Sequence, residues 1–221
     1  MQFADFERLI SAPRINKYVT ACNHDKRKAQ ALYRANIRLS QELFAVMCIF
    51  EIVLRNAIDI SYRNSKGIDW IYDSVQPGGI FHARGCEKTL QSIQDVIQSL
   101  AGAYTPDKAV AEFTFGFWTY LFGSKQFAAA GSTLLNVFPA RPFGLNHTKV
   151  FKKLSSINRI RNKIAHHEPV CFGTPLSIST VYSLVKYNEI MDVLKWMAID
   201  TNSLFFGIDH VHKEISNINK L

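Results

Sequence analysis

Three polar residues, Arg161, Asn162 and His166, fall within six positions of a segment that is otherwise basic or apolar. In a helix, at about 100° per residue, Asn162 and His166 are one turn apart and share a face, whereas Arg161 and His166 are offset by about 140°. The long arginine side chain closes part of that offset within one chain, and a second copy of the helix would also bring the two groups together. The segment therefore offers a guanidinium, an amide and an imidazole at one helix end.

These three groups suit the cleavage of RNA without a metal ion. Attack by a ribose 2′-hydroxyl on the adjacent phosphate needs a base to accept the proton, an acid to protonate the leaving 5′-oxygen, and fixed positive charge for the developing phosphorane. Histidine acts as base or acid near neutral pH, and the planar fork of arginine matches two phosphate oxygens. The spacing is short, and a surface arginine followed by a helix-ending histidine is the alternative interpretation.

The surrounding sequence supplies positive charge. Seven Lys and Arg residues and three histidines stand between Arg141 and His167 with no Asp or Glu, in a chain whose formal net charge is +8. Neutralisation of phosphates by Lys and Arg provides most of the sequence-independent affinity for nucleic acid. A solvated helix face is the alternative. The residues expected to contact RNA phosphates are Lys152, Lys153, Arg159 and Lys163.

The elements that must position these groups read as helices. Apolar residues recur at intervals of three and four rather than two, which predicts an all-α bundle in a single domain over residues 1–221. A pattern from about Lys28 to Arg63, without proline or glycine, predicts one long N-terminal spine helix. The tail over 201–221 is expected to be weakly structured. Further helices are expected over about 90–100, from 106 on through 113–122, over about 154–164 and over 177–199.

An aromatic block within that series is interpreted as core packing. Six of the ten residues from Phe113 to Phe122 are aromatic, but no basic residue is interleaved before Lys125. Surfaces that stack single-stranded bases combine aromatic rings with positive charge. The block is therefore assigned to the hydrophobic core.

Composition and spacing exclude several other classes of protein. The four cysteines form neither a CxxC pair nor a Cys/His cluster, and His210 and His212 lack a nearby third ligand, so we predict reduced thiols, no metal site and no cofactor. No glycine-rich phosphate loop or paired-aspartate motif supports nucleotide transfer. No apolar stretch approaches the roughly 20 residues that cross a bilayer. Residues 1–10 do not resemble a signal peptide, and a cytoplasmic location is expected.

Several sequence blocks resemble one known family. The segment from Arg161 to His166 resembles the Arg-x(4 to 6)-His signature of the HEPN (higher eukaryotes and prokaryotes nucleotide-binding) superfamily. Residues 157–169, Ile-Asn-Arg-Ile-Arg-Asn-Lys-Ile-Ala-His-His-Glu-Pro, resemble its Abi-like (abortive infection) branch. The blocks 50–59, with Glu-x-x-Leu-Arg-Asn-Ala, and 112–118, Glu-Phe-Thr-Phe-Gly-Phe-Trp, are similar to that branch too. The matches run in the right order over roughly residues 30–170.

The resemblance implies a HEPN-type helical bundle that pairs across a twofold axis, so that two Arg-x4-His helices build one metal-independent ribonuclease site. Carried over by position, Arg161 binds the phosphate, His166 is the acid and base, and Asn162 orients it. The expected protein is an endoribonuclease of a prokaryotic phage-defence or toxin–antitoxin system that leaves 2′,3′-cyclic phosphate and 5′-hydroxyl ends. RNA, a second copy of the chain, and an antitoxin or phage-derived activator are the implied partners.

Four residues are weaker candidates for a supporting role around that site. Glu51 and Arg55 are spaced to pair along their own helix, or else Glu51, Arg55 or Asn56 reaches the motif helix. His167 points about 100° away from His166 on a helix, so it is expected to cap the helix or contact RNA. The alternative function is a non-catalytic HEPN dimer that binds RNA, a nucleotide or a protein partner.

Overall fold

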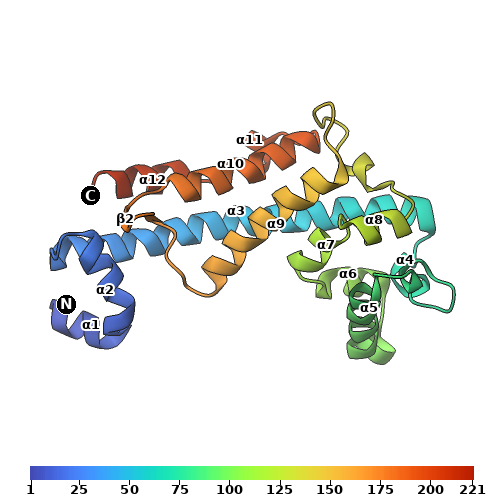
Figure 1. Cartoon of the computed structure of the whole chain (residues 1–221), viewed down its shortest axis with the longest axis horizontal. Coiled ribbons are helices and arrows are strands. Elements are labelled where there is room, and N and C mark those ends of the chain that lie inside the picture. Colours follow the sequence, from blue (N-terminus) through green and yellow to red (C-terminus); the bar gives the residue numbers. More distant parts are fainter. The chain divides into compact units, whose positions relative to one another are not determined.

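The protein is mainly helical in the computed structural model, which describes all residues 1–221 (Figure 1). The strands are a single antiparallel pair, β1 (Phe172–Gly173) and β2 (Ser177–Ile178). The predicted all-α class is therefore confirmed. None of the helices combines the length and the apolar character that a membrane-spanning segment requires.

The helices divide between two compact units, each assembled from separate stretches of the chain. The first unit comprises Met1–Cys48, Arg159–Met191 and Asn202–Leu221, and the second comprises Ile49–Asn158 and Asp192–Thr201. Three helices contribute residues to both units, namely α3 (Lys26–Lys66), α9 (His147–Ala165) and α10 (Val181–Trp196). That the two units form the single domain expected over the whole chain stays a prediction.

The long helix predicted from the apolar spacing is α3, whose 41 residues extend past the predicted range at both ends. Its start is capped by Asp25, whose Oδ1 accepts hydrogen bonds from the backbone N–H groups of Arg27 (2.9 Å) and Lys28 (3.0 Å). Its end is followed by Gly67 at a φ of 107°, a conformation that favours glycine. The eight apolar residues whose spacing predicts this helix are all at most 3% exposed, namely Leu32, Leu39, Leu43, Val46, Met47, Phe50, Leu54 and Ile58.

In the first unit, two short helices lie beside the N-terminal part of α3 (Figure 1). They are α1 (Phe3–Ile10) and α2 (Ala12–Ala21). The Tyr33 ring of α3 meets Phe6 of α1 edge-on at 5.4 Å and Tyr18 of α2 at 5.2 Å between centroids. These aromatic contacts attach the N-terminal helices to the unit that carries the Arg161 segment.

The C-terminal tail is more ordered than the sequence predicts. It contains α11 (Thr201–Leu204) and α12 (Val211–Asn219), and Val211, Ile215 and Ile218 of α12 are buried. Asn219 at its end accepts a hydrogen bond from the Thr180 hydroxyl at 3.0 Å. The expectation of a weakly structured tail was wrong, because an amphipathic pattern of only nine residues is stabilised by packing rather than by its own helix propensity.

The second unit packs short helices around the aromatic block. They are α4 (Trp70–Asp73), α5 (Glu87–Leu100), α6 (Pro106–Glu112), α7 (Phe115–Tyr120) and α8 (Ser124–Ala129), with 3₁₀ turns at Ile80–His82, Ala101–Ala103 and Leu134–Val137. The indole N–H of the buried Trp70 donates to Asp59 at 2.8 Å, and Asp59 also pairs with Arg63 at 2.8 Å. Phe113, Phe115, Trp118 and Phe122 are buried, whereas Phe117 is half-buried and Tyr120 is exposed. The prediction that the block packs in the core is therefore confirmed for four of its six aromatic residues.

Two predicted helix boundaries need correction. The Thr105 cap is confirmed, since its Oγ1 accepts from the backbone N–H of Lys108 at 3.2 Å. The helix it starts ends at Glu112, however, because Phe113 adopts an extended conformation (ψ 137°) before α7 begins. The helix predicted over 177–199 spans only 181–196, because β2 takes up its first two residues.

Candidate functional site

The candidate site is built on the C-terminal end of α9. The N–H of His167 donates to the carbonyl of Ile164 at 2.9 Å, and the N–H of Glu168 donates to Lys163 at 2.8 Å. His167 has a φ of 57°, so it occupies the left-handed position that ends a helix in the Schellman arrangement. The helix therefore stops before Pro169, as the sequence predicts. Arg161 lies on its last turns, and His166 and His167 lie where the chain reverses.

Hydrogen bonds from other elements of the first unit hold this helix end. Val170 donates its N–H to Asn36 Oδ1 of α3 at 2.9 Å and accepts a hydrogen bond from the Ser183 hydroxyl of α10 at 2.6 Å. Arg14 of α2 donates through Nη1 to the carbonyl of His167 at 3.1 Å. Asn36 and Ser183 are buried, so α2, α3 and α10 together fix the segment that carries the two histidines.

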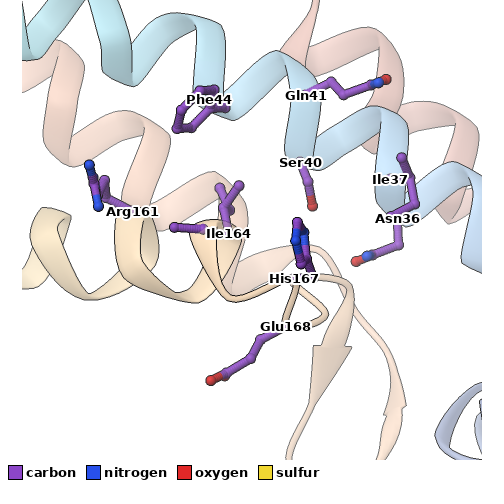
Figure 2. A pocket seen from close by; sticks show the side chains of 10 residues that line it. Asn36, Ile37, Ser40, Gln41, Phe44, Arg161, Ile164, His167 and Glu168 are labelled. Carbon is purple, nitrogen blue, oxygen red and sulfur yellow. The ribbon is translucent and has the colours of Figure 1, made fainter. Parts of the chain in front are cut away.

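Arg161 lines a pocket between α3 and the end of α9 (Figure 2). The pocket has a volume of about 490 Å³. The Arg161 side chain is partly buried, and its Nε is buried without a hydrogen-bond partner. A desolvated donor that lacks an acceptor costs about 1–3 kcal/mol. The lining residues come from α3 (Asn36, Ile37, Ser40, Gln41, Phe44) and from the α9 end (Arg161, Ile164, Ala165, His167, Glu168).

His166 lines a different pocket, of about 350 Å³, on the side of α2. That pocket also contains Arg14 and Lys17, which add positive charge. His166 and Asn162 are exposed, and the imidazole of His166 makes no hydrogen bond within the chain. His167 lines both pockets. Within one chain, therefore, the imidazole that shares a pocket with Arg161 belongs to His167, and the offset expected between Arg161 and His166 is present.

The four lysines and arginines expected to contact phosphate are not equally available. Arg159, in the first unit, and Lys152, in the second, are exposed. Lys163 lies over the Tyr182 ring at 5.4 Å. Lys153 forms an ion pair with Asp192 at 3.0 Å and lies over the Trp196 ring at 5.2 Å. Arg159 and Lys152 are thus the members of this set that keep an uncommitted charge.

The supporting residues predicted on the spine helix belong to the second unit. Glu51, Arg55 and Asn56 lie on the part of α3 that starts at Ile49. Arg55 has a buried Nε without a hydrogen-bond partner, and Asn56 is exposed. Their predicted contact with the motif helix stays a prediction.

The cysteines and metal-binding side chains do not add to this site. All four cysteines are free thiols, as predicted, and Cys22, Cys86 and Cys171 are buried. Burial raises the pKa of Cys171 to about 12 and also raises the pKa values of Cys22 and Cys86. These three thiols therefore stay protonated and weakly nucleophilic near neutral pH. The chain contains no group of three or more His, Cys, Asp or Glu side chains placed to hold a metal ion.

The sequence did not point to the residues of α3 that line the pocket beside Arg161. Asn36 carried a usable signal, because a polar residue one turn from Leu32 and near Leu39 lies on the buried stripe of the helix. Phe44 and Ser40 carried none, since they follow no recognisable spacing relative to Arg161. Comparison of the chain with known protein families, curated proteins and solved structures finds no match.

Proposed function

We propose that this protein is a metal-independent endoribonuclease of the Abi-like HEPN type. The observation that carries the proposal is the state of two groups at the end of α9. Arg161 holds a buried Nε without an acceptor at the edge of a pocket, and His166 presents an exposed imidazole with no partner in the chain. A bound phosphate would accept hydrogen bonds from the terminal nitrogens of the Arg161 guanidinium, which make none within the chain, and the exposed imidazole is within reach of a substrate.

The chemistry follows from those two groups. A histidine accepts the proton of a ribose 2′-hydroxyl, and the 2′-oxygen attacks the adjacent phosphorus. The negative charge that develops on the phosphorane oxygens is stabilised by Arg161. The bond from phosphorus to the 5′-oxygen then breaks, and a protonated histidine gives that oxygen its proton. The products are a 2′,3′-cyclic phosphate and a 5′-hydroxyl, and no water is consumed in this step.

The proposal places the active site between two copies of the chain. Arg161 and His166 line different pockets of one chain, so a single copy does not direct both groups into one pocket. A twofold axis beside the α9 ends would bring the arginine of one copy toward the histidine of the other. The histidine that accepts the 2′-hydroxyl proton would then donate it to the leaving 5′-oxygen, so one arginine and one histidine from opposite copies suffice for a site.

The remaining parts of the proposal concern RNA and cellular role. Exposed Arg159 and Lys152 are the proposed contacts for the RNA backbone, with Asn162 beside the histidine. Single-stranded regions are the proposed target, because their sugars and bases can be splayed out. A cytoplasmic role in phage defence or as a toxin, under an antitoxin or a phage-derived activator, rests on the family resemblance alone.

The test is cleavage of a mixed-sequence single-stranded RNA in excess chelator by wild type, Arg161→Ala and His166→Ala. Both variants are expected to lose activity by at least about a hundredfold, because each removes a group that acts in the transition state. Mass spectrometry of the wild-type products should show cyclic-phosphate and 5′-hydroxyl ends. The matched controls are Arg38→Ala and His212→Ala, which remove an arginine and a histidine of the first unit outside both pockets.

Circular dichroism must first show that all variants are folded. Absence of cleavage by wild type, or equal cleavage by every variant, would reject the catalytic assignment. Salt-sensitive RNA binding without cleavage would instead support the non-catalytic HEPN dimer that the sequence leaves open.

A further inference from the structure

We propose that the pocket beside Arg161 binds one unpaired nucleobase of the RNA, stacked on Phe44, next to the phosphate that Arg161 contacts. This inference rests on the proposed ribonuclease function and adds the part of the substrate that the pocket recognises. The volume of about 490 Å³ lies within the range of small-ligand sites.

Phe44 gives the pocket an aromatic wall that the core does not require. Its ring is 42% exposed, whereas its neighbours on α3, Leu43 and Met47, are at most 3% exposed. Figure 2 shows the Phe44 ring on α3 facing the part of α9 that carries Ile164 and Arg161. Exposed aromatic side chains next to positive charge are the usual platforms on which single-stranded bases stack. Phe44 and Ile164 would thus contact the two faces of a flat ring.

The opposite end of the pocket offers hydrogen-bonding groups. In Figure 2 the side chains of Ser40 and Asn36 point toward the His167 ring. Asn36 Oδ1 is occupied by the Val170 N–H, so its Nδ2 is the group left to donate. The Ser40 hydroxyl and the His167 imidazole make no hydrogen bond within the chain. A few polar groups in an apolar pocket are what the edge of a base requires, and only an unpaired base presents that edge.

The guanidinium of Arg161 is a separate indication that this pocket binds a ligand, because it lines the pocket and makes no hydrogen bond within the chain. The walls of the pocket are largely apolar and offer the guanidinium no acceptor. A nucleotide supplies both missing parts at once, since its base fits the apolar walls and its phosphate accepts from the guanidinium. The base bound here would belong to a nucleotide that flanks the scissile phosphate.

The test measures binding of a short fluorescent single-stranded RNA whose 2′-oxygens are methylated, so that the nucleophile is blocked. Phe44→Ala is expected to weaken binding about fivefold to 150-fold, the range that stacking of one base contributes. Phe44→Tyr keeps the ring and should bind like wild type. The matched control is Phe206→Ala, which removes an aromatic side chain of the first unit that is 87% exposed and lies outside both pockets.

A second arm identifies the base as the group recognised. Single nucleotides of the RNA are replaced in turn by abasic ribose, which keeps every phosphate. At one position the abasic RNA should bind wild type as weakly as the intact RNA binds Phe44→Ala, and the two changes should not add. Additive losses at every position would overturn the proposal.

Other outcomes also decide the question. Wild-type affinity in Phe44→Ala, or equal losses in Phe44→Ala and Phe206→Ala, would overturn the base pocket. So would unchanged RNA affinity with lost self-association, which would identify the pocket as a contact between two copies. If RNA binding depends on Phe44 but the wild type does not cut unmodified RNA, the ribonuclease proposal is rejected and the base pocket is supported.

Discussion

His167 has a backbone conformation that glycine adopts more easily than any other residue. Its φ of 57° lies in the left-handed region, and it stands two residues after the end of α9, at the position where glycine is the usual residue. A side chain there costs about 1–2 kcal/mol, somewhat less for histidine, which tolerates this region. Its imidazole lines both pockets of the candidate site. Strain at such a place supports a functional use of the side chain.

Replacing His167 by glycine should stabilise the protein and impair its function. His167→Gly is expected to raise the free energy of unfolding by about 0.5–1 kcal/mol, because the relief of backbone strain exceeds the entropy that glycine adds to the unfolded chain. It should also weaken RNA binding. Urea denaturation measures the first effect. His167→Ala is the control, since it removes the ring but keeps the strain, and a glycine variant no more stable than the alanine variant would refute the account.

Some individual residues of the candidate site could be predicted from the sequence. Residue type and spacing pointed to Arg161, Asn162 and His166, because they lie within one short helical segment. Asn36 and Phe44 escaped notice because their closeness to that segment depends on the fold. The hydrogen bond from Val170 to Asn36 joins residues 134 positions apart, and no local pattern reports a contact over that distance.

Among the elements, the long helices were predicted better than the short ones. α3, α5 and α9 carry several turns of apolar residues at three- and four-residue spacing, which determines a helix from sequence alone. The break between α6 and α7 falls at Phe113 without a proline or glycine to mark it. At this break the Phe113 ring stacks on Phe117 at 3.8 Å between centroids.

The hydrogen bond from α3 to the loop after α9 is expected to stabilise the helix end that carries the site. Asn36→Ala should lower the free energy of unfolding by about 1–3 kcal/mol, because it leaves the buried N–H of Val170 without an acceptor. Gln41→Ala, an exposed change on the same helix, should stay within about 0.5 kcal/mol. Urea denaturation compares the two variants, and hydrogen exchange of the Val170 amide should accelerate only in Asn36→Ala. Equal stability of both variants would disprove this role.

For the whole molecule, charge and helix content were predictable and the division into two units was not. Composition predicted a basic protein and the spacing of apolar residues predicted an all-α one. The unit boundaries at Cys48 and Asn158, however, fall inside α3 and α9, where no linker marks them. The proposed dimer is likewise a property of the whole molecule. If each site takes Arg161 from one copy and His166 from the other, a preparation in which every chain carries Arg161→Ala contains no complete site. The same holds when every chain carries His166→Ala.

Mixing two inactive variants tests whether the active site is shared between two copies of the chain. Arg161→Ala and His166→Ala are each assayed alone, then unfolded together, refolded as a mixture and assayed for cleavage of single-stranded RNA in excess chelator. Mixed dimers retain one arginine and one histidine on opposite chains, so we expect the mixture to regain a substantial fraction of wild-type cleavage. A mixture as inactive as either variant, beside a wild type that cuts under the same conditions, would contradict a site shared between two copies.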